Sequence, residues 1–189
     1  MILKEDVANY LASEYLRDQR PLTIRAIRPE DSGLVIDALS KVSLDSMYLR
    51  FFSAKTKFSD DEIKKATEVD FLNVVALVAV LEEDGGKKIV GGGRYFRTDT
   101  GAEVAFLVKD DYHGLGIGSR IFKHLVTIAR ASGIRQFEAE VLPGNKGMLM
   151  LFSRSGLPVT QSQTSDAVHL TIALTMEEGL SQQVGPSAG

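Results

Sequence analysis

The 189-residue sequence contains no cysteine. This absence excludes disulfide bonds, thiolate-ligated zinc and a cysteine nucleophile, so any catalytic base or nucleophile must be another residue type. Long apolar runs are missing as well, and the N-terminal segment MILKEDVANYLASEYLRDQR carries charges throughout rather than an apolar core behind a basic start. We therefore expect a cytoplasmic protein with no membrane partner.

Basic residues are not in excess. The chain has 22 Lys and Arg against 25 Asp and Glu, which gives a net charge of -3. Without a basic surface field to hold phosphodiester backbones, no nucleic-acid partner is expected. His, Asp and Glu show no metal-ligand spacing, so no metal is expected either. The composition, 44% hydrophobic and 25% charged, is that of one ordinary globular domain.

Helical and strand patterns alternate along the chain. Apolar residues at helical spacing over residues 4–18 predict a helical lead-in, and the alternating segment 22–26 predicts the first strand. A capping box, Ser59 with Glu62, marks the start of a later helix. The helices expected between the first and second strands cover residues 29–39, 43–50 and 59–69.

The second half of the chain predicts most of the sheet. Residues 74–81 and 88–96 read as a β-hairpin around a turn at 84–86. Further strands are expected at 103–108, 137–142, 157–161 and 167–174, with helices at 117–131 and 145–155. The predicted class is α/β, with a mixed, mostly antiparallel sheet of six to seven strands, flanking helices and a central parallel pair joined by a right-handed crossover.

The same patterns suggest how the chain is divided. We assign residues 1–21 to the helical lead-in and residues 22–175 to a single domain without internal repeats or linkers. Residues 176–189, rich in Gln, Ser and Gly, are expected to form a flexible tail.

A glycine-rich turn separates the strand at 103–108 from the helix at 117–131. Its sequence, Tyr-His-Gly-Leu-Gly-Ile-Gly-Ser at residues 112–119, has glycines at alternate positions, so the backbone bends tightly and approaches an anion closely. Unpaired amides at the helix start would face that anion, assisted by the helix dipole. The pattern is neither a Rossmann fingerprint nor a Walker loop. It predicts a pyrophosphate cradle, although the same glycines also suit a plain turn.

This turn resembles the signature of the GNAT superfamily of N-acetyltransferases, which is Gln or Arg, two residues, Gly, one residue, and Gly or Ala. His113, Gly116 and Gly118 match it, with His in the first place. The likeness covers residues 22–175 and implies a GNAT fold whose parallel strands splay apart for acetyl-CoA, the expected cosubstrate. By resemblance, coenzyme A is contacted by Phe106, Leu107, Val108, His113, Gly114, Leu115, Gly116, Ile117, Gly118, Ser119 and Asn145.

A narrower likeness lies in residues 48–53 (YLRFFS) and 102–105 (AEVA). These segments resemble the acetyltransferase domain of bacterial Pat-type protein lysine acetyltransferases, which regulate acyl-CoA synthetases. The resemblance implies that the acceptor is an exposed lysine of a protein substrate. Relatives often carry a fused sensing domain, and none is visible in this sequence, so we expect a stand-alone catalytic domain.

Acetyl transfer requires a neutral amine, and a lysine with a pKa of about 10.4 is almost wholly protonated at neutral pH. Glu103 is the candidate base, because burial in an otherwise apolar strand would raise its pKa toward neutrality. The Pat resemblance supports this role, and the alternative is a solvent-facing strand end. Many GNAT enzymes protonate the leaving thiolate with a Tyr, which is Phe152 here, so solvent or another donor must replace it.

Other readings stay open. The acceptor is alternatively a small amine, or the chain is a non-catalytic module that senses acyl-CoA. Residues 50–52 (Arg-Phe-Phe) suit either the core or an acceptor channel. His124 and His169 are expected at packing or surface positions. The glycines at 91–93 are expected to mark a bulge or a close approach of strands.

Overall fold

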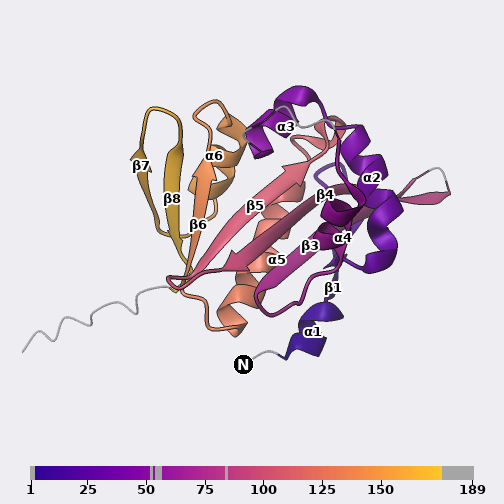
Figure 1. Ribbon diagram of the computed structural model, residues 1–189, viewed down its shortest axis with the longest axis horizontal. Helices are drawn as coiled ribbons and strands as arrows, with labels where there is room; N and C mark the ends of the chain where they lie inside the picture. The colour runs from indigo at the N-terminus through magenta and orange to yellow at the C-terminus, as the bar shows by residue number, and fades with distance from the viewer. Residues whose placement is uncertain (1–2, 52, 54–56, 84, 176–189) are drawn as a thin grey trace, which may run out of the picture.

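The computed structural model describes residues 3–51, 53, 57–83 and 85–175, which form one eight-stranded sheet in the order β1-β2-β3-β4-β5-β6-β8-β7 (Figure 1). The strands are β1 (Leu11–Tyr15), β2 (Pro21–Ala26), β3 (Val74–Glu83), β4 (Gly86–Arg97), β5 (Ala102–Val108), β6 (Gln136–Val141), β7 (Val159–Gln163) and β8 (Val168–Ala173). The helices are α1 (Lys4–Ala8), α2 (Ser32–Ser40), α3 (Leu44–Phe51), α4 (Asp60–Thr67), α5 (Ile117–Ala131) and α6 (Lys146–Ser153), with short 3-10 helices η1 (Pro29–Asp31) and η2 (Asp110–Tyr112). Within this described part, no helix has the length and apolarity that a bilayer crossing requires.

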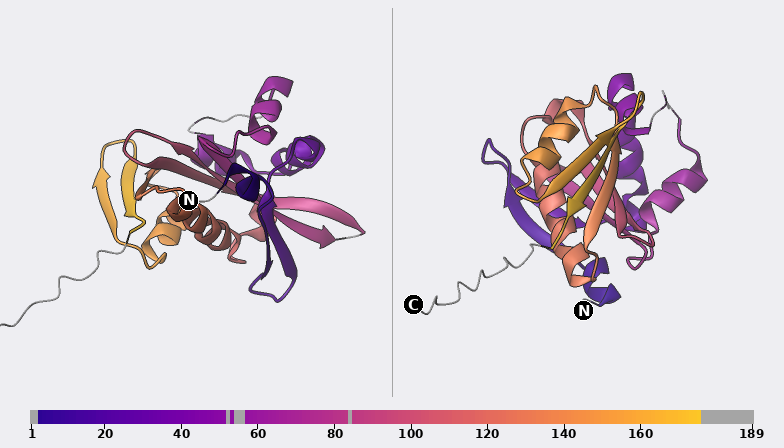
Figure 2. Two further views of the ribbon diagram at one scale, coloured as in Figure 1. Left: turned by 90° about the horizontal axis from the view of Figure 1, so that it is seen from below. Right: turned by 90° about the vertical axis from the view of Figure 1, so that its left-hand side faces the viewer.

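Helices cover both faces of the sheet (Figures 1 and 2). The long helix α5 packs across β3, β4 and β5 on one face, and α2, α3 and α4 lie on the other. Neighbouring strands pair antiparallel throughout the described sheet except for β5 and β6, which are parallel. The predicted mixed α/β class is confirmed, with eight strands in place of six or seven.

The extra strand comes from the N-terminal segment, where the prediction of one helix over residues 4–18 is wrong. α1 ends at Ala8, and residues 11–15 pair antiparallel with β2 instead. The helical spacing was misleading because Leu11 and Tyr15 are 61% and 59% exposed and form no buried face. Pairing with the open edge of β2 satisfies the backbone amides and carbonyls of this segment.

The other predicted helices and strands lie close to their expected ranges. The capping box is present, since Ser59 Oγ accepts from the Glu62 amide at 3.3 Å and the Ser59 amide donates to Glu62 Oε2 at 3.0 Å. Helix α5 covers the predicted residues 117–131. Position 84 of the predicted hairpin turn and the predicted tail at 176–189 lie outside the described residues.

The glycines of β4 bring α5 close to the sheet. A Cβ atom on Gly93 would lie 2.5 Å from Phe106 Cδ1 and 2.7 Å from Ile121 Cγ2, so only glycine fits between strand and helix here. The β3–β4 register also shifts between Ala79 and Val80, beside this glycine run. The expected bulge is therefore found, and the close approach at Gly93 is that of α5 and the Phe106 side chain to β4 rather than of two strands.

The parallel strands β5 and β6 pair over a short distance only. Their register joins Ala102 with Phe137 and Glu103 with Glu138. Beyond these two pairs β5 runs on to Val108 without β6 beside it, while β4 stays paired to its other edge. The predicted splay of the parallel pair is therefore present, and it leaves one backbone edge of β5 open past Glu103.

Candidate functional site

The glycine-rich turn leads from the end of β5 into α5. Gly114 and Gly116 have φ angles of +78° and +84°, which side chains rarely adopt, so both positions favour glycine. Gly116 is the N-cap of α5. The described part of the chain offers no hydrogen-bond acceptor to the amides of residues 114–119. These amides therefore face outward at the positive end of the helix, where an anion is stabilised.

Two arginines hold the carbonyl side of this turn. Arg17, in the turn after β1, donates from Nη1 to Gly114 O at 2.8 Å and from its amide to Leu115 O at 3.2 Å. Arg120 on α5 donates from Nη1 to Gly116 O at 3.0 Å. These bonds fix the turn with its amides free and place two positive charges beside it.

A cleft of about 470 Å³, which we name the loop cleft, opens beside the turn between α3, the end of β5 and α6. Of the eleven residues that the resemblance assigned to coenzyme A, the loop cleft is lined by Phe106, Leu107, Val108, His113, Gly114, Gly116, Ile117, Gly118, Ser119 and Asn145. The remaining one, Leu115, packs against the hydrophobic core. The structure thus brings nearly the whole predicted set to one cleft.

A second space of about 300 Å³, the strand cleft, lies where β5 and β6 diverge. Glu103, Ala139 and Phe152 line it, and Asn145 lines both clefts. Asn145 also caps α6, because its Oδ1 accepts from the Met148 amide at 3.1 Å. The two clefts therefore join at the start of α6.

Phe152 belongs to the core. Its ring is 1% exposed and stands edge-on to Phe106 and Phe122, with centroid distances of 6.1 and 5.4 Å. Tyr112 is the phenol that lines the loop cleft, and its hydroxyl donates to Glu83 Oε2 at 2.7 Å. That hydroxyl is engaged with β3, so it is not a replacement for a phenol at position 152.

Glu103 is exposed, so the expectation that this carboxylate is buried is wrong. The alternation along β5 buries Ala102, Val104 and Phe106 under α5 and turns Glu103 to the opposite face of the sheet. Glu103 nevertheless lines the strand cleft and a third space on its own face. Its position, rather than burial, makes it a candidate for chemistry.

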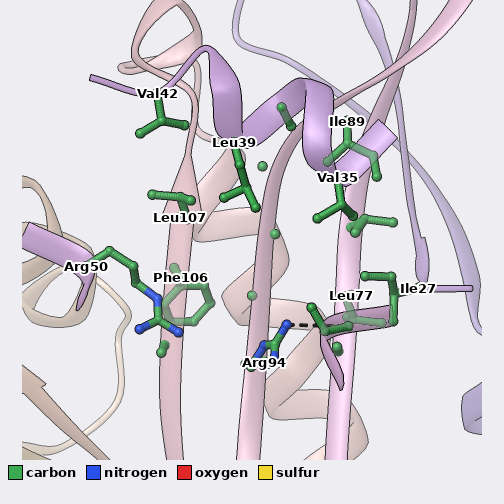
Figure 3. A pocket seen from close by; sticks show the side chains of 18 of the residues that line it. Ile27, Val35, Leu39, Val42, Arg50, Leu77, Ile89, Arg94, Phe106 and Leu107 are labelled. Atoms are coloured by element: carbon green, nitrogen blue, oxygen red, sulfur yellow. Dashed lines mark hydrogen bonds between the residues drawn. The ribbon is translucent and has the colours of Figure 1, made fainter. Parts of the chain in front are cut away.

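The third space, which we name the arginine hollow, has a volume of about 460 Å³ and lies between α2, α4 and strands β3 to β5 (Figure 3). Apolar side chains from α2 and β3 form much of its wall, and Arg50, Phe51 and Arg94 line it too. Arg50 and Phe106 line all three spaces. Residues 50 and 51 therefore face the channel rather than the core, and Phe52 lies outside the described residues.

The junction of the three spaces is positively charged. Burial and the nearby charge of Arg94 lower the pKa of Arg50 to about 10, against the opposing effect of Glu103. Burial likewise lowers the pKa of Arg94. Both guanidinium groups remain charged at neutral pH, and both reach the same end of the hollow in Figure 3.

Three arginines of the site escaped the sequence reasoning. Arg17 and Arg154 line the loop cleft, and Arg94 lines the arginine hollow. Arg17 was hidden in the segment predicted as a helix. Arg94 carried the one usable indication, because it directly follows the three glycines in the central part of its strand.

The two histidines outside the turn have the packing and surface environments that were expected. His124 Nδ1 lies 2.6 Å from Tyr10 Oη and its Nε2 lies 3.0 Å from Glu14 Oε1, between α5 and β1. His169 is exposed on β8. Neither lines any of the three spaces.

Comparison with known proteins agrees with the site. The Acetyltransferase (GNAT) family matches residues 43–157. An acetyltransferase of Pseudomonas aeruginosa is 28% identical over 86% of this chain and 88% of its own length. Acetyltransferase Pat of Mycolicibacterium smegmatis is 32% identical over 70% of this chain and 40% of its own length, so this chain spans less than half of Pat.

A solved structure shows the same architecture. The GNAT domain of S. lividans PAT superposes with a TM-score of 0.80 and 32% identity, over 86% of this chain and 96% of that domain. The predicted GNAT fold is thereby confirmed. The chain belongs to the GNAT acetyltransferase family. It is an acetyl-CoA-dependent N-acetyltransferase.

Proposed function

We propose that the protein transfers the acetyl group of acetyl-CoA to the ε-amine of a lysine in a protein substrate, with acyl-CoA synthetases as the target class. The likeness to Pat of M. smegmatis and to the GNAT domain of S. lividans PAT supports a protein acceptor. The observation that carries the proposal is the position of Glu103, whose carboxylate lines both the strand cleft and the arginine hollow. The Glu103 carboxylate therefore lies between the proposed acetyl-CoA site and the proposed acceptor site.

Acetyl-CoA fits the loop cleft by chemistry. The free amides of residues 114–119 and the guanidinium of Arg17 suit a pyrophosphate. The pantetheine arm would pass between β5 and β6 beside Asn145, where the edge of β5 is open. Amides along a strand point alternately to its two edges, and the Lys109 amide donates to Val90 O of β4. The amides of Phe106 and Val108 therefore lie on the open edge of β5 and are available to the thioester carbonyl as it becomes an oxyanion.

The reaction is a direct attack. The acceptor ammonium first loses a proton to Glu103, directly or through one water, and the neutral nitrogen attacks the thioester carbon. The new C–N bond forms, the attacking nitrogen releases its second proton to solvent, the C–S bond breaks, and coenzyme A departs as a thiolate. Phe152 supplies no proton, so solvent protonates a thiolate whose conjugate thiol has a pKa of about 8.5. Since Glu103 is exposed, its contribution comes from its position beside the acceptor.

The test is mass spectrometry of a purified acyl-CoA synthetase incubated with the protein and acetyl-CoA. We expect one modified active-site lysine, and a rate lowered about 100-fold in Glu103→Gln with unchanged acetyl-CoA affinity. Glu82→Gln is the matched control, because it removes an exposed carboxylate that lines none of the three spaces. An unmodified synthetase, together with rapid release of free coenzyme A on small amines, would overturn the protein acceptor.

A small amine is the second candidate acceptor. The arginine hollow favours it, because a space of about 460 Å³ is large enough to enclose most of a small ligand. Coenzyme A release measured with a panel of amines and with the synthetase side by side separates the two. The larger kcat/KM identifies the acceptor class.

A further inference from the structure

The arginine hollow has two chemically different ends. Val35, Leu39 and Val42 gather at one end, and Arg50 and Arg94 lie at the other (Figure 3). A hollow of this kind suits a ligand that carries both an aliphatic part and an anionic group.

Small residues in the sheet make room for the charged end. On this face of the sheet Arg94 stands between its register partners Ala76 and Ala105, and the neighbouring row places Gly92 beside Leu107. Because alanine and glycine have small side chains, they leave space above the sheet beside Arg94. The guanidinium of Arg94 lies over the ring of Phe96, with its Cζ atom 5.8 Å from the ring centroid, and both side chains line the hollow.

Neither guanidinium is paired with a carboxylate in the described part of the chain. Arg94 donates one long hydrogen bond, from Nη2 to Ala66 O at 3.4 Å. Arg50 lies against the ring of Phe51, with its Cζ atom 4.8 Å from the ring centroid. Burial lowers the pKa of both groups, the direction expected for a cation that has lost contact with water.

Arg25 shows what a satisfied arginine looks like in this protein. Its Nη1 and Nη2 each donate to a different oxygen of Asp31, both at 2.7 Å. This is the two-point geometry in which a guanidinium binds a carboxylate best. Arg50 and Arg94 lack such a partner, and their positive charges repel each other. A carboxylate that enters the hollow would pair with the guanidinium groups and offset this repulsion.

The acidic residues of the hollow do not fill this need. Glu103 attracts Arg50 but makes no ion pair with it within the described residues, and it is the proposed base. Glu62 is engaged in the capping box with Ser59. A third basic residue, Lys109, lines the hollow farther along the chain, just past the end of β5, where its amide donates to Val90 O. The hollow therefore keeps a positive end.

We propose that Arg50 and Arg94 bind a carboxylate carried by the acceptor, so that this enzyme selects amines with a carboxylate nearby. The inference rests on the proposed transfer to an amine and names a feature of its substrate. Two sources supply the same chemistry. One is an acidic side chain next to the target lysine of a protein, and the other is the free carboxylate of an amino acid.

The experiment compares Nα-acetyl-lysine with Nα-acetyl-lysinamide, which replaces the carboxylate by a neutral amide and keeps the ε-amine. We expect kcat/KM to be about 10- to 100-fold higher for the carboxylate form, as for a hydrogen bond to a charged group. Arg94→Gln and Arg50→Gln should each reduce this preference to within about threefold of unity. Arg94→Lys keeps the positive charge but not the two-point hydrogen bonding of a guanidinium, so it should retain part of the preference for the carboxylate form.

Two controls separate this effect from general damage. Arg135→Gln removes one exposed positive charge outside the hollow and should keep the full preference. Glu103→Gln should slow both compounds, since it alters the proton transfer, and should keep the preference for the carboxylate form because both arginines remain. Peptide pairs with Glu-Lys and Gln-Lys then identify the source, because only a protein acceptor site discriminates between them.

Calorimetric titration of the two lysine derivatives in the presence of coenzyme A makes the outcome independent of turnover. Tighter binding of the carboxylate form that is lost in Arg94→Gln, without acetylation of any amine, would uphold the carboxylate site and reject the proposed function. Equal kcat/KM and equal affinity for the two derivatives in the wild type would overturn the inference. So would a preference that Arg50→Gln and Arg94→Gln leave intact.

Discussion

The imidazole Nε2 of His113 donates a hydrogen bond of 2.9 Å to the carbonyl oxygen of Val108, the last residue of β5. A carbonyl oxygen only accepts, so this nitrogen carries the proton. The bond ties the glycine-rich turn to the end of the strand. His113 therefore has a structural role in the turn. The family has Gln or Arg at this signature position, and those side chains can also donate a hydrogen bond.

The first prediction concerns this position. His113→Gln should keep the bond to Val108 and bind acetyl-CoA about as tightly as the wild type. His113→Ala should raise the Kd about 5- to 10-fold, the usual loss for one hydrogen bond that orders a loop. Calorimetric titration with acetyl-CoA measures both. Equal affinities in all three proteins would show that the side chain has no part in shaping the turn.

Arg17 supports a second prediction, because it joins the first hairpin to the glycine-rich turn. Arg17→Gln should weaken acetyl-CoA binding about 10-fold through loss of a charged group beside the proposed pyrophosphate site. S-acetylpantetheine lacks the phosphates, so its binding should change little. A matched loss for both ligands would mean that Arg17 only folds the turn. Arg135→Gln serves as the charge control.

The features that could be predicted from the sequence depend on local chemistry. The start of α4 follows from the reciprocal bonds of Ser59 and Glu62, and the ends of α5 follow from glycines at 116 and 133. The tight bend of the glycine-rich turn also follows from local residues, because glycines at 114 and 116 adopt positive φ angles before an amphipathic helix. Neighbours along the chain favour these features, so they can be predicted without knowledge of tertiary contacts.

The features that could not be predicted depend on distant partners. The apolar residues of segment 11–15 have helical spacing, but the segment forms a strand because it pairs with the open edge of β2. The exposure of Glu103 depends on which face of β5 the helix α5 covers, and alternation alone leaves that choice open. Arg94 reaches the site from another strand, and its role appears only when α2, α3 and α4 enclose the hollow.

Glycines at the two ends of α5 give a third prediction with a built-in control. Gly116 and Gly133 have φ angles of +84° and +78°, so alanine at either position should cost about 1 kcal/mol of stability. Only Gly116→Ala should also weaken acetyl-CoA binding, because its Cβ would meet the Arg120 guanidinium beside the free amides. Thermal unfolding and calorimetry measure the two effects. An affinity loss in Gly133→Ala would show that helix stability, not loop shape, governs binding.

The last prediction concerns pH and the turn before β3. The Asp70 carboxylate accepts hydrogen bonds from the amides of Leu72, Asn73 and Val74 at 3.0, 2.8 and 2.8 Å. Burial opposes the charged form, but these bonds outweigh it and lower the pKa of Asp70 to about 2. A lowered pKa in the folded state means that the carboxylate stabilises the protein above its unfolded pKa of about 3.9.

Asp70→Asn should therefore lower the free energy of unfolding at neutral pH by about 1 kcal/mol, a value discounted for the exposure of this side chain. The gap between wild type and variant should shrink as the pH falls from about 4 toward 2, where the wild-type carboxylate becomes protonated. Denaturant unfolding at a series of pH values measures this. Asp99→Asn, in the exposed turn between β4 and β5, is the control and should show no such convergence. A gap that stays constant down to pH 2 would mean that the stability lost in Asp70→Asn does not come from the charge of the carboxylate.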